Sequence, residues 1–318
     1  MRYVNSRPRV MRSAALALLV ILSTTFLAFA LQQQGSAAEG QRTEPIFRVK
    51  PRQQPADQFV PVQNPSNMQS QLVTNPHQTG PQQTAPEHPL MPALRIAEAS
   101  LASIDQNIHD YTCTLVKRER IDGQLGPQEY IFAKVRHEPF SVYMYFLGPK
   151  EIKGRECMYV ASNPNKKKNK LIAHEGRGLI TPTVRLNPNG FLAMRGQRYP
   201  ITEVGIRTLT VRLVEVAQND LQFGECEVKF FQGTKVNGRV CTCIQVMHPT
   251  RRKQFRFHLA RVFIDDELQV PIRYEAYQWP TKPGGKPLLD EEYTYMNLKI
   301  NQGLTDADFN ERNADYNF

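Results

Sequence analysis

Apolar residues recur at helical spacing in two segments of the chain. In residues 92–109 they form one stripe that includes Leu94, Leu101 and Ile108, and residues 201–217 repeat this pattern. Both segments are therefore predicted to be amphipathic helices that bury one side.

Elsewhere beyond residue 110, apolar and polar residues alternate with a period of two, which is typical of half-buried strands. Turn signals separate these runs, and Asn237-Gly238 is the strongest hairpin signal. Hairpins in succession predict an α+β fold with an antiparallel sheet of about ten strands and helices on one face. The expected strands span 111–121, 128–136, 140–147, 156–160, 170–175, 179–186, 225–236, 239–247, 254–264, 270–278 and 291–300.

The N-terminus has the parts of a secretory signal. Four arginines between Arg2 and Arg12 precede an uncharged, mostly apolar run over 14–31, and small residues follow at Ser36 and Ala38. We therefore expect export to the periplasm or cell envelope, with residues 1–38 as a signal peptide. The run is near the lower limit of a membrane span, about 17 residues, so an uncleaved signal anchor is the alternative.

Composition divides the rest of the chain into a linker and a domain. Residues 39–89 are rich in Gln, Pro, Asn and Thr, and such a segment buries too little apolar surface to offset its ordering entropy. We expect a disordered linker there and a β-rich globular domain over 90–318. The net charge of +10 favours anionic surfaces as partners.

Several segments carry a resemblance to a known family. YTCTLVKRERIDGQL (Tyr111 to Leu125) is followed by YIFAKVRHEPFSVYMYFLGP (Tyr130 to Pro149). Near the C-terminus stand FIDDELQVPIRYEAYQWP (Phe263 to Pro280) and YTYMNLKINQGLTDADF (Tyr293 to Phe309). This succession resembles the bacterial family called domain of unknown function 1571, which in turn resembles the lipoprotein-carrier superfamily typified by LolA and RseB.

The resemblance implies a curved antiparallel sheet, or half-barrel, with two to three helices on its concave face. It also implies that this face holds a lipid, an acyl chain or a lipoprotein. An alternating sheet has one apolar face, which can accept a lipid chain where the sheet curls without a full core. The alternative is that the same side chains only pack against the helices. The candidates for the apolar face are Tyr130, Phe132, Val142, Met144, Phe146, Phe255, Phe257, Tyr274 and Tyr293.

Two basic clusters are candidates for contact with anionic headgroups. They lie in expected hairpin or loop segments and comprise Lys166, Lys167, Lys168 and Lys170, and Arg251, Arg252 and Lys253. Ordinary solvated loops are the alternative. Export and the absence of interleaved aromatic residues argue against nucleic acid as a partner.

No sequence motif predicts catalysis, a metal or a cofactor. His174-Glu175 begins like a zinc-protease motif, but Gly178 occupies the position of the second histidine. The acidic pairs Asp265/Asp266 and Glu291/Glu292 are expected to form a hairpin turn and a solvated edge.

The cysteines are expected to be mainly buried thiols, with a bridge from Cys113 or Cys157 left open. A two-residue turn at Asn237-Gly238 would place Cys241 opposite Thr234 and Cys243 opposite Gln232.

These observations favour a non-enzymatic envelope protein that binds an apolar ligand. A protein-interaction or sensor module is the second hypothesis, with another envelope protein as its partner. An enzyme of unrecognised type is the third.

Overall fold

The computed structural model describes residues 87–161, 170–176 and 182–318, all within one compact unit that spans Asp57–Phe318. The predicted signal and most of the predicted linker lie outside the described residues. None of the helices in the described part is long and apolar enough to cross a membrane.

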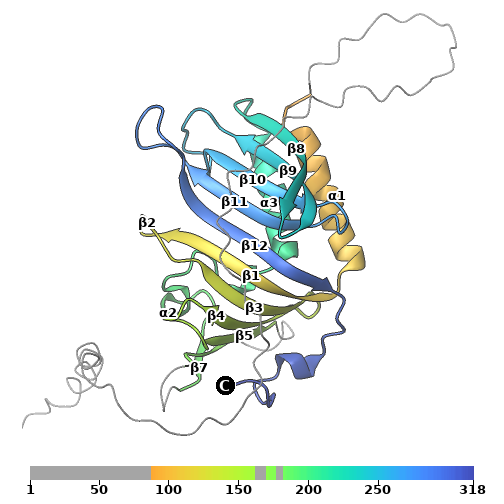
Figure 1. Ribbon diagram of the computed structural model, residues 1–318, viewed down its shortest axis with the longest axis vertical. Helices are drawn as coiled ribbons and strands as arrows, with labels where there is room; N and C mark the ends of the chain where they lie inside the picture. Colours follow the sequence, from red (N-terminus) through yellow and green to blue (C-terminus); the bar gives the residue numbers. More distant parts are fainter. Residues whose placement is uncertain (1–86, 162–169, 177–181) are drawn as a thin grey trace, which may run out of the picture. The chain divides into compact units, whose positions relative to one another are not determined.

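The described strands form one large antiparallel sheet (Figure 1). The strands are β1 (Asp110–Ile121), β2 (Gln124–Leu125), β3 (Glu129–Arg136), β4 (Ser141–Gly148), β5 (Glu156–Val160), β6 (Leu171–His174), β7 (Val184–Leu186), β8 (Glu227–Val236), β9 (Arg239–Met247), β10 (Leu259–Asp265), β11 (Pro271–Gln278) and β12 (Leu288–Ile300). Their order is β7-β6-β5-β4-β3-β1-β12-β11-β10-β9-β8, and β2 pairs only with β1. The two end strands, β7 and β8, do not pair with each other. This arrangement confirms the predicted open antiparallel sheet.

The helices are α1 (Met91–Asn107), α2 (Phe191–Met194) and α3 (Ile206–Asp220), with 3₁₀ turns η1 (Ile201–Glu203) and η2 (Asp306–Phe309). α1 and α3 pack on each other, and α3 contacts β11. The second predicted helix is in fact divided. Gly205 has φ +125°, a conformation that favours glycine, so η1 ends before it and α3 begins after it.

The hairpin at Asn237-Gly238 forms as predicted, with positive φ at both residues. Thr234 faces Cys241 as expected, but Cys243 faces Phe231 and not Gln232. The register shifts between Phe231 and Thr234, where Gly233 takes φ +70°, and the resulting bulge inserts one extra residue in β8.

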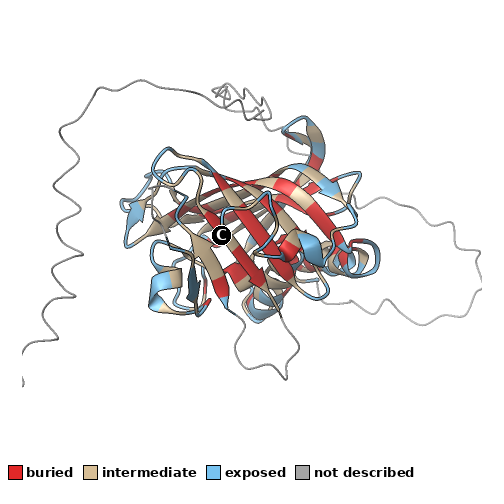
Figure 2. Cartoon of the chain, turned by 90° about the horizontal axis from the view of Figure 1, so that it is seen from below, coloured by how far each residue is buried: buried red, intermediate tan, exposed pale blue. Residues whose placement is uncertain are grey.

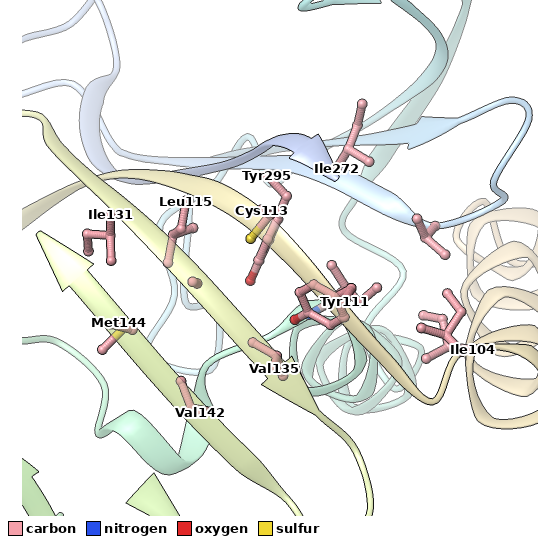
Figure 3. Close-up of a cluster of buried hydrophobic side chains, with 14 of the residues drawn as sticks. Ile104, Tyr111, Cys113, Leu115, Ile131, Val135, Val142, Met144, Ile272 and Tyr295 are labelled. Atoms are coloured by element: carbon pink, nitrogen blue, oxygen red, sulfur yellow. The ribbon is translucent and has the colours of Figure 1, made fainter. Parts of the chain in front are cut away.

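The main apolar core joins both halves of the sheet to α1. Figure 3 shows part of this core, with side chains from α1, from β1, β3 and β4, and from β11 and β12. In the view of Figure 2, buried stretches run along the strands, whereas exposed residues gather in the connections. In β1, β3 and β4 the residues that belong to the main core alternate along the strand, as the period of two predicts.

The C-terminal segment after β12 covers the outer face of β3, β4 and β5. Tyr316 stacks on Tyr143 with ring centroids 3.9 Å apart, and Phe309 belongs to the same apolar cluster. Lys134 Nζ donates to Asp308 Oδ1 at 2.8 Å, and Glu156 accepts from the backbone and side chain of Asn317. This covering leaves the opposite face of these strands to form the cavity described next.

Candidate functional site

A cavity of about 670 Å³ lies between the inner face of the sheet and the segment formed by residues 188–220. Its floor comes from residues of strands β1, β3 to β7 and β9 to β12. Its cover comes from η1, α3 and the connection that contains α2. The volume is within the roughly 300–1,000 Å³ that small-molecule sites usually occupy.

The first part of the cavity lies over strands β3 to β7 and is mainly apolar. Ile131, Met144 and Phe146 form its floor, and Leu171 and Leu186 extend it toward the edge strand. Arg155 and Glu175 also line this part, but their side chains form an ion pair at 2.8 Å.

A second apolar part lies over the other half of the sheet, beneath α3. Val262, Tyr274 and Ala276 form its floor, and Leu213 and Val216 of α3 face them. The order of the strands places β1 and β12 between the two apolar parts.

Charged side chains of β1 and β12 occupy this central position. Lys117 pairs in register with Tyr293, and Glu119 pairs with Glu291. Lys117 Nζ donates to Glu119 Oε2 at 3.2 Å and to Gln197 Oε1 at 2.6 Å. Because the two glutamates lie directly opposite each other, their repulsion must be offset by these and the following contacts.

Arg198 of the covering connection holds the acidic side of this cluster. Its guanidinium lies 2.6 Å from Asp290 and 3.1 Å from Glu291, and its backbone N–H donates to Glu119. The cover is therefore tied to the floor by charge-assisted hydrogen bonds, which are stronger than neutral ones.

Burial shifts the ionisation of this cluster. It raises the pKa of Glu291, of Tyr293 and of Tyr199, in the last case to about 12. Tyr293 Oη donates to Glu119 at 2.6 Å and lies 3.2 Å from Glu291. A phenol has one proton, so the second contact is a hydrogen bond only when Glu291 is protonated and donates it.

The structure brings together most of the residues predicted for the apolar face. Five of them line the cavity: Met144, Phe146, Phe257, Tyr274 and Tyr293. Val142 lies in the main core, and Phe255 stacks on His248 with ring centroids 3.9 Å apart. Their role in binding a ligand stays a prediction.

The placement predicted for Tyr130 and Phe132 was wrong. The inward residues of β3 are Ile131, Ala133 and Val135, so Tyr130 and Phe132 point to the opposite face. Phe132 packs in the cluster covered by the C-terminal segment, and Tyr130 is exposed there. Both faces of β3 carry apolar residues, so alternation alone could not select the inner one.

The charged centre was missed in the sequence. Glu291 was expected at a solvated edge, but it is 5% exposed because β12 is a central strand. The sequence did contain a signal for it. Lys117 and Glu119 are spaced by two residues from the buried Cys113 and Leu115, so they lie on the same face of the strand. Charged residues at inward positions of a strand indicate a polar part of the interior.

The described residues of the two predicted basic clusters do not line the cavity. Lys166, Lys167 and Lys168 lie outside the described residues. Lys170, Arg251, Arg252 and Lys253 are exposed, and Arg252 pairs with Glu225 at 2.6 Å. Contact of these residues with a membrane stays a prediction.

The five cysteines, all within the described residues, are free thiols. Burial raises the pKa of Cys113, Cys157 and Cys243 to about 12. Within the described ranges, no three His, Cys, Asp or Glu side chains are grouped so that they could hold a metal ion.

The chain belongs to the family described as protein of unknown function DUF1571, whose model matches residues 108–318. No curated protein is significantly similar to it. Among solved structures it is similar to a putative outer membrane lipoprotein-sorting protein domain from Vibrio parahaemolyticus, with 12% identity over 70% of this chain and 97% of that one and a TM-score of 0.33.

Two further solved structures show similarity of the same degree. The lipoprotein LppX from Mycobacterium tuberculosis has 14% identity over 67% of this chain and 98% of that one, with a TM-score of 0.37. The LolA superfamily protein NE2245 from Nitrosomonas europaea has 10% identity over 67% of this chain and 97% of that one, with a TM-score of 0.26.

Proposed function

We propose that the domain is a non-enzymatic envelope protein that holds the apolar chain of a lipid or lipoprotein in the cavity. The observation that carries this proposal is the cavity itself, with apolar parts over both halves of the sheet. Transfer of apolar surface from water contributes about 25 cal/mol per Å². An acyl chain placed against these side chains would therefore be stabilised along its length.

The charged centre supports an amphiphilic ligand over a purely apolar one. Lys117, Glu119, Arg198 and Glu291 are partly or fully buried, and their polar atoms are the sites at which a polar group could form hydrogen bonds. The predicted export signal accords with a place in the cell envelope.

Native mass spectrometry of the chain purified from an envelope fraction tests this proposal. We expect a co-purifying species of lipid mass. Ala173 lines the cavity from β6, so Ala173→Trp should fill the first apolar part and lower the bound fraction. Ala102 is exposed on α1 and does not line the cavity, so Ala102→Trp is the matched control.

Loss of the lipid mass in Ala173→Trp alone, with unchanged circular dichroism, would support the proposal. A wild-type chain that carries no ligand and takes up no added lipid would refute it. The protein-interaction or sensor module would then be the favoured hypothesis.

A further inference from the structure

Two large apolar side chains project into solvent at the edge of the cavity. Phe191 is 83% exposed and Leu192 is 66% exposed, the highest values among the large hydrophobic residues of the described ranges. Val184, on the edge strand β7, is 41% exposed. Leu192 and Val184 also line the cavity, so this apolar lip (Val184, Phe191 and Leu192) is continuous with it.

The backbone holds the lip in this position. Gly190 N–H donates to Asn187 O at 2.9 Å, and Met194 N–H donates to Gly190 O at 2.9 Å, which closes the single turn of α2. Ala193 packs against the main core. Ala193, the small residue of this turn, faces the core, so the larger side chains of Phe191 and Leu192 face the solvent.

The charge beside the lip is positive. Arg195 is exposed and lines the cavity, and it forms no ion pair with any described residue. The acidic residues of the same region already have basic partners, since Glu175 pairs with Arg155 and Glu311 pairs with Arg185. An anionic surface would therefore meet an arginine with no carboxylate to displace.

We propose that the apolar lip inserts into an anionic lipid bilayer and that Arg195 contacts the phosphate groups beside it. Exposed apolar side chains can enter the acyl boundary of a bilayer, and a cation beside them can contact the anionic headgroups. A second copy of the chain fits less well. A stable dimer buries about 800 Å² on each partner, whereas an aromatic side chain buries only about 150–250 Å².

Docking through the lip would place the cavity against the membrane, which contains the lipid proposed as its ligand. That consequence rests on the proposed function, but the docking itself does not. Insertion and ligand binding can therefore be tested separately.

Tryptophan fluorescence in the full chain measures insertion directly. Trp279 is the only native tryptophan, so Trp279→Phe provides a background for Phe191→Trp. The matched control is Val240→Trp, because Val240 is 47% exposed on β9, away from α2. The vesicles contain phosphatidylcholine and phosphatidylglycerol, with or without brominated acyl chains that quench a tryptophan in the bilayer.

We expect brominated chains to lower the fluorescence at position 191 by about half or more, since interfacial side chains sit about 5–10 Å deep. Position 240 should be unaffected, and Arg195→Glu should reduce the quenching at position 191. Equal quenching at both positions would overturn the proposal. So would a lipid-independent spectral shift at position 191 that grows with protein concentration, because this indicates a second copy.

The proposed function has its own readout in this experiment. If position 191 is not quenched but the purified chain still carries a lipid mass, the docking is wrong and ligand binding stands. If Phe191→Asp retains the lipid mass but no longer co-sediments with these vesicles, the lip acts in docking alone.

Discussion

Replacement of Asp265 should destabilise the turn between β10 and β11. The carboxylate is 1% exposed and accepts four hydrogen bonds. Two come from Arg239 at 2.5 and 2.7 Å, and two come from the backbone N–H groups of Glu267 and Leu268 at 3.0 and 2.9 Å. This turn lies in the segment from Phe263 to Pro280 that carries part of the family resemblance.

The expected cost follows from these contacts. A hydrogen bond to a charged group contributes about 1.5 kcal/mol, and an ion pair with an exposed partner contributes about 0.2–1 kcal/mol. Arg239 is 40% exposed, so we assign its ion pair with Asp265 the contribution of an exposed pair. Asp265→Ala should therefore cost about 3–4 kcal/mol. Asp265→Asn keeps the Oδ1 acceptor for both backbone N–H groups and should cost about 1–2 kcal/mol.

The pH dependence gives this prediction a second test. Burial acts to raise the pKa of Asp265, but the hydrogen bonds from Arg239, Leu268 and Glu267 outweigh it, and the pKa is lowered overall. A carboxyl whose pKa is lower in the folded state stabilises the fold above its unfolded pKa of about 3.9. This stability is lost as the pH falls through the folded pKa. The difference between wild type and Asp265→Asn should therefore shrink in acid.

Urea unfolding at pH 7 and at acidic pH measures both effects. Asp266→Asn is the matched control, because Asp266 is exposed and accepts one side-chain hydrogen bond, from Thr242. If Asp265→Asn is as stable as Asp266→Asn at pH 7, or if its deficit does not change with pH, the reasoning about this turn is wrong.

Three further predictions concern the core, the thiols and the charged centre. Gly205→Ala should cost about 2–4 kcal/mol in urea unfolding, because a Cβ there would lie 2.8 Å from Tyr111 Oη at φ +125°; an unchanged midpoint would contradict this. The five cysteines are free, and Cys113, Cys157 and Cys243, with a pKa of about 12, should react with a thiol reagent at pH 8 only after unfolding. Rapid labelling of these three thiols in the native protein would refute this. Burial raises the pKa of Glu291, so its ionised form lowers the stability of the fold above the unfolded pKa. Glu291→Gln should therefore change the free energy of unfolding at pH 7 by less than about 1 kcal/mol. A loss of several kcal/mol would show that the ion pair with Arg198 requires the charge.

The sequence predicted most elements of this fold because local patterns set them. The stripe from Leu94 to Ile108 identifies α1, and the Asn237-Gly238 turn fixes where β8 meets β9. The predicted strand over 254–264 begins only at Leu259, because residues before it form a loop in which Phe255 stacks on His248. The boundary depends on this packing in the loop, which the alternation of apolar and polar residues does not show.

The candidate site was determined by the sequence only in part. Alternation in β4 identified Met144 and Phe146, since the period of two places both on one face. It could not distinguish the two faces of β3, where the C-terminal segment supplies apolar partners for Phe132 on the outer side. The sequence alone thus determined which residues share a face of a strand.

The tertiary structure alone decided which of these faces became the inside and what closes over it. The pairing of β1 with β12 brings Glu119 opposite Glu291, although the residues lie far apart along the chain. Arg198 then reaches this pair from a connection with no regular pattern of its own. The cavity and its charged centre arise from such long-range contacts, which depend on how the strands pair and not on the period within any one of them.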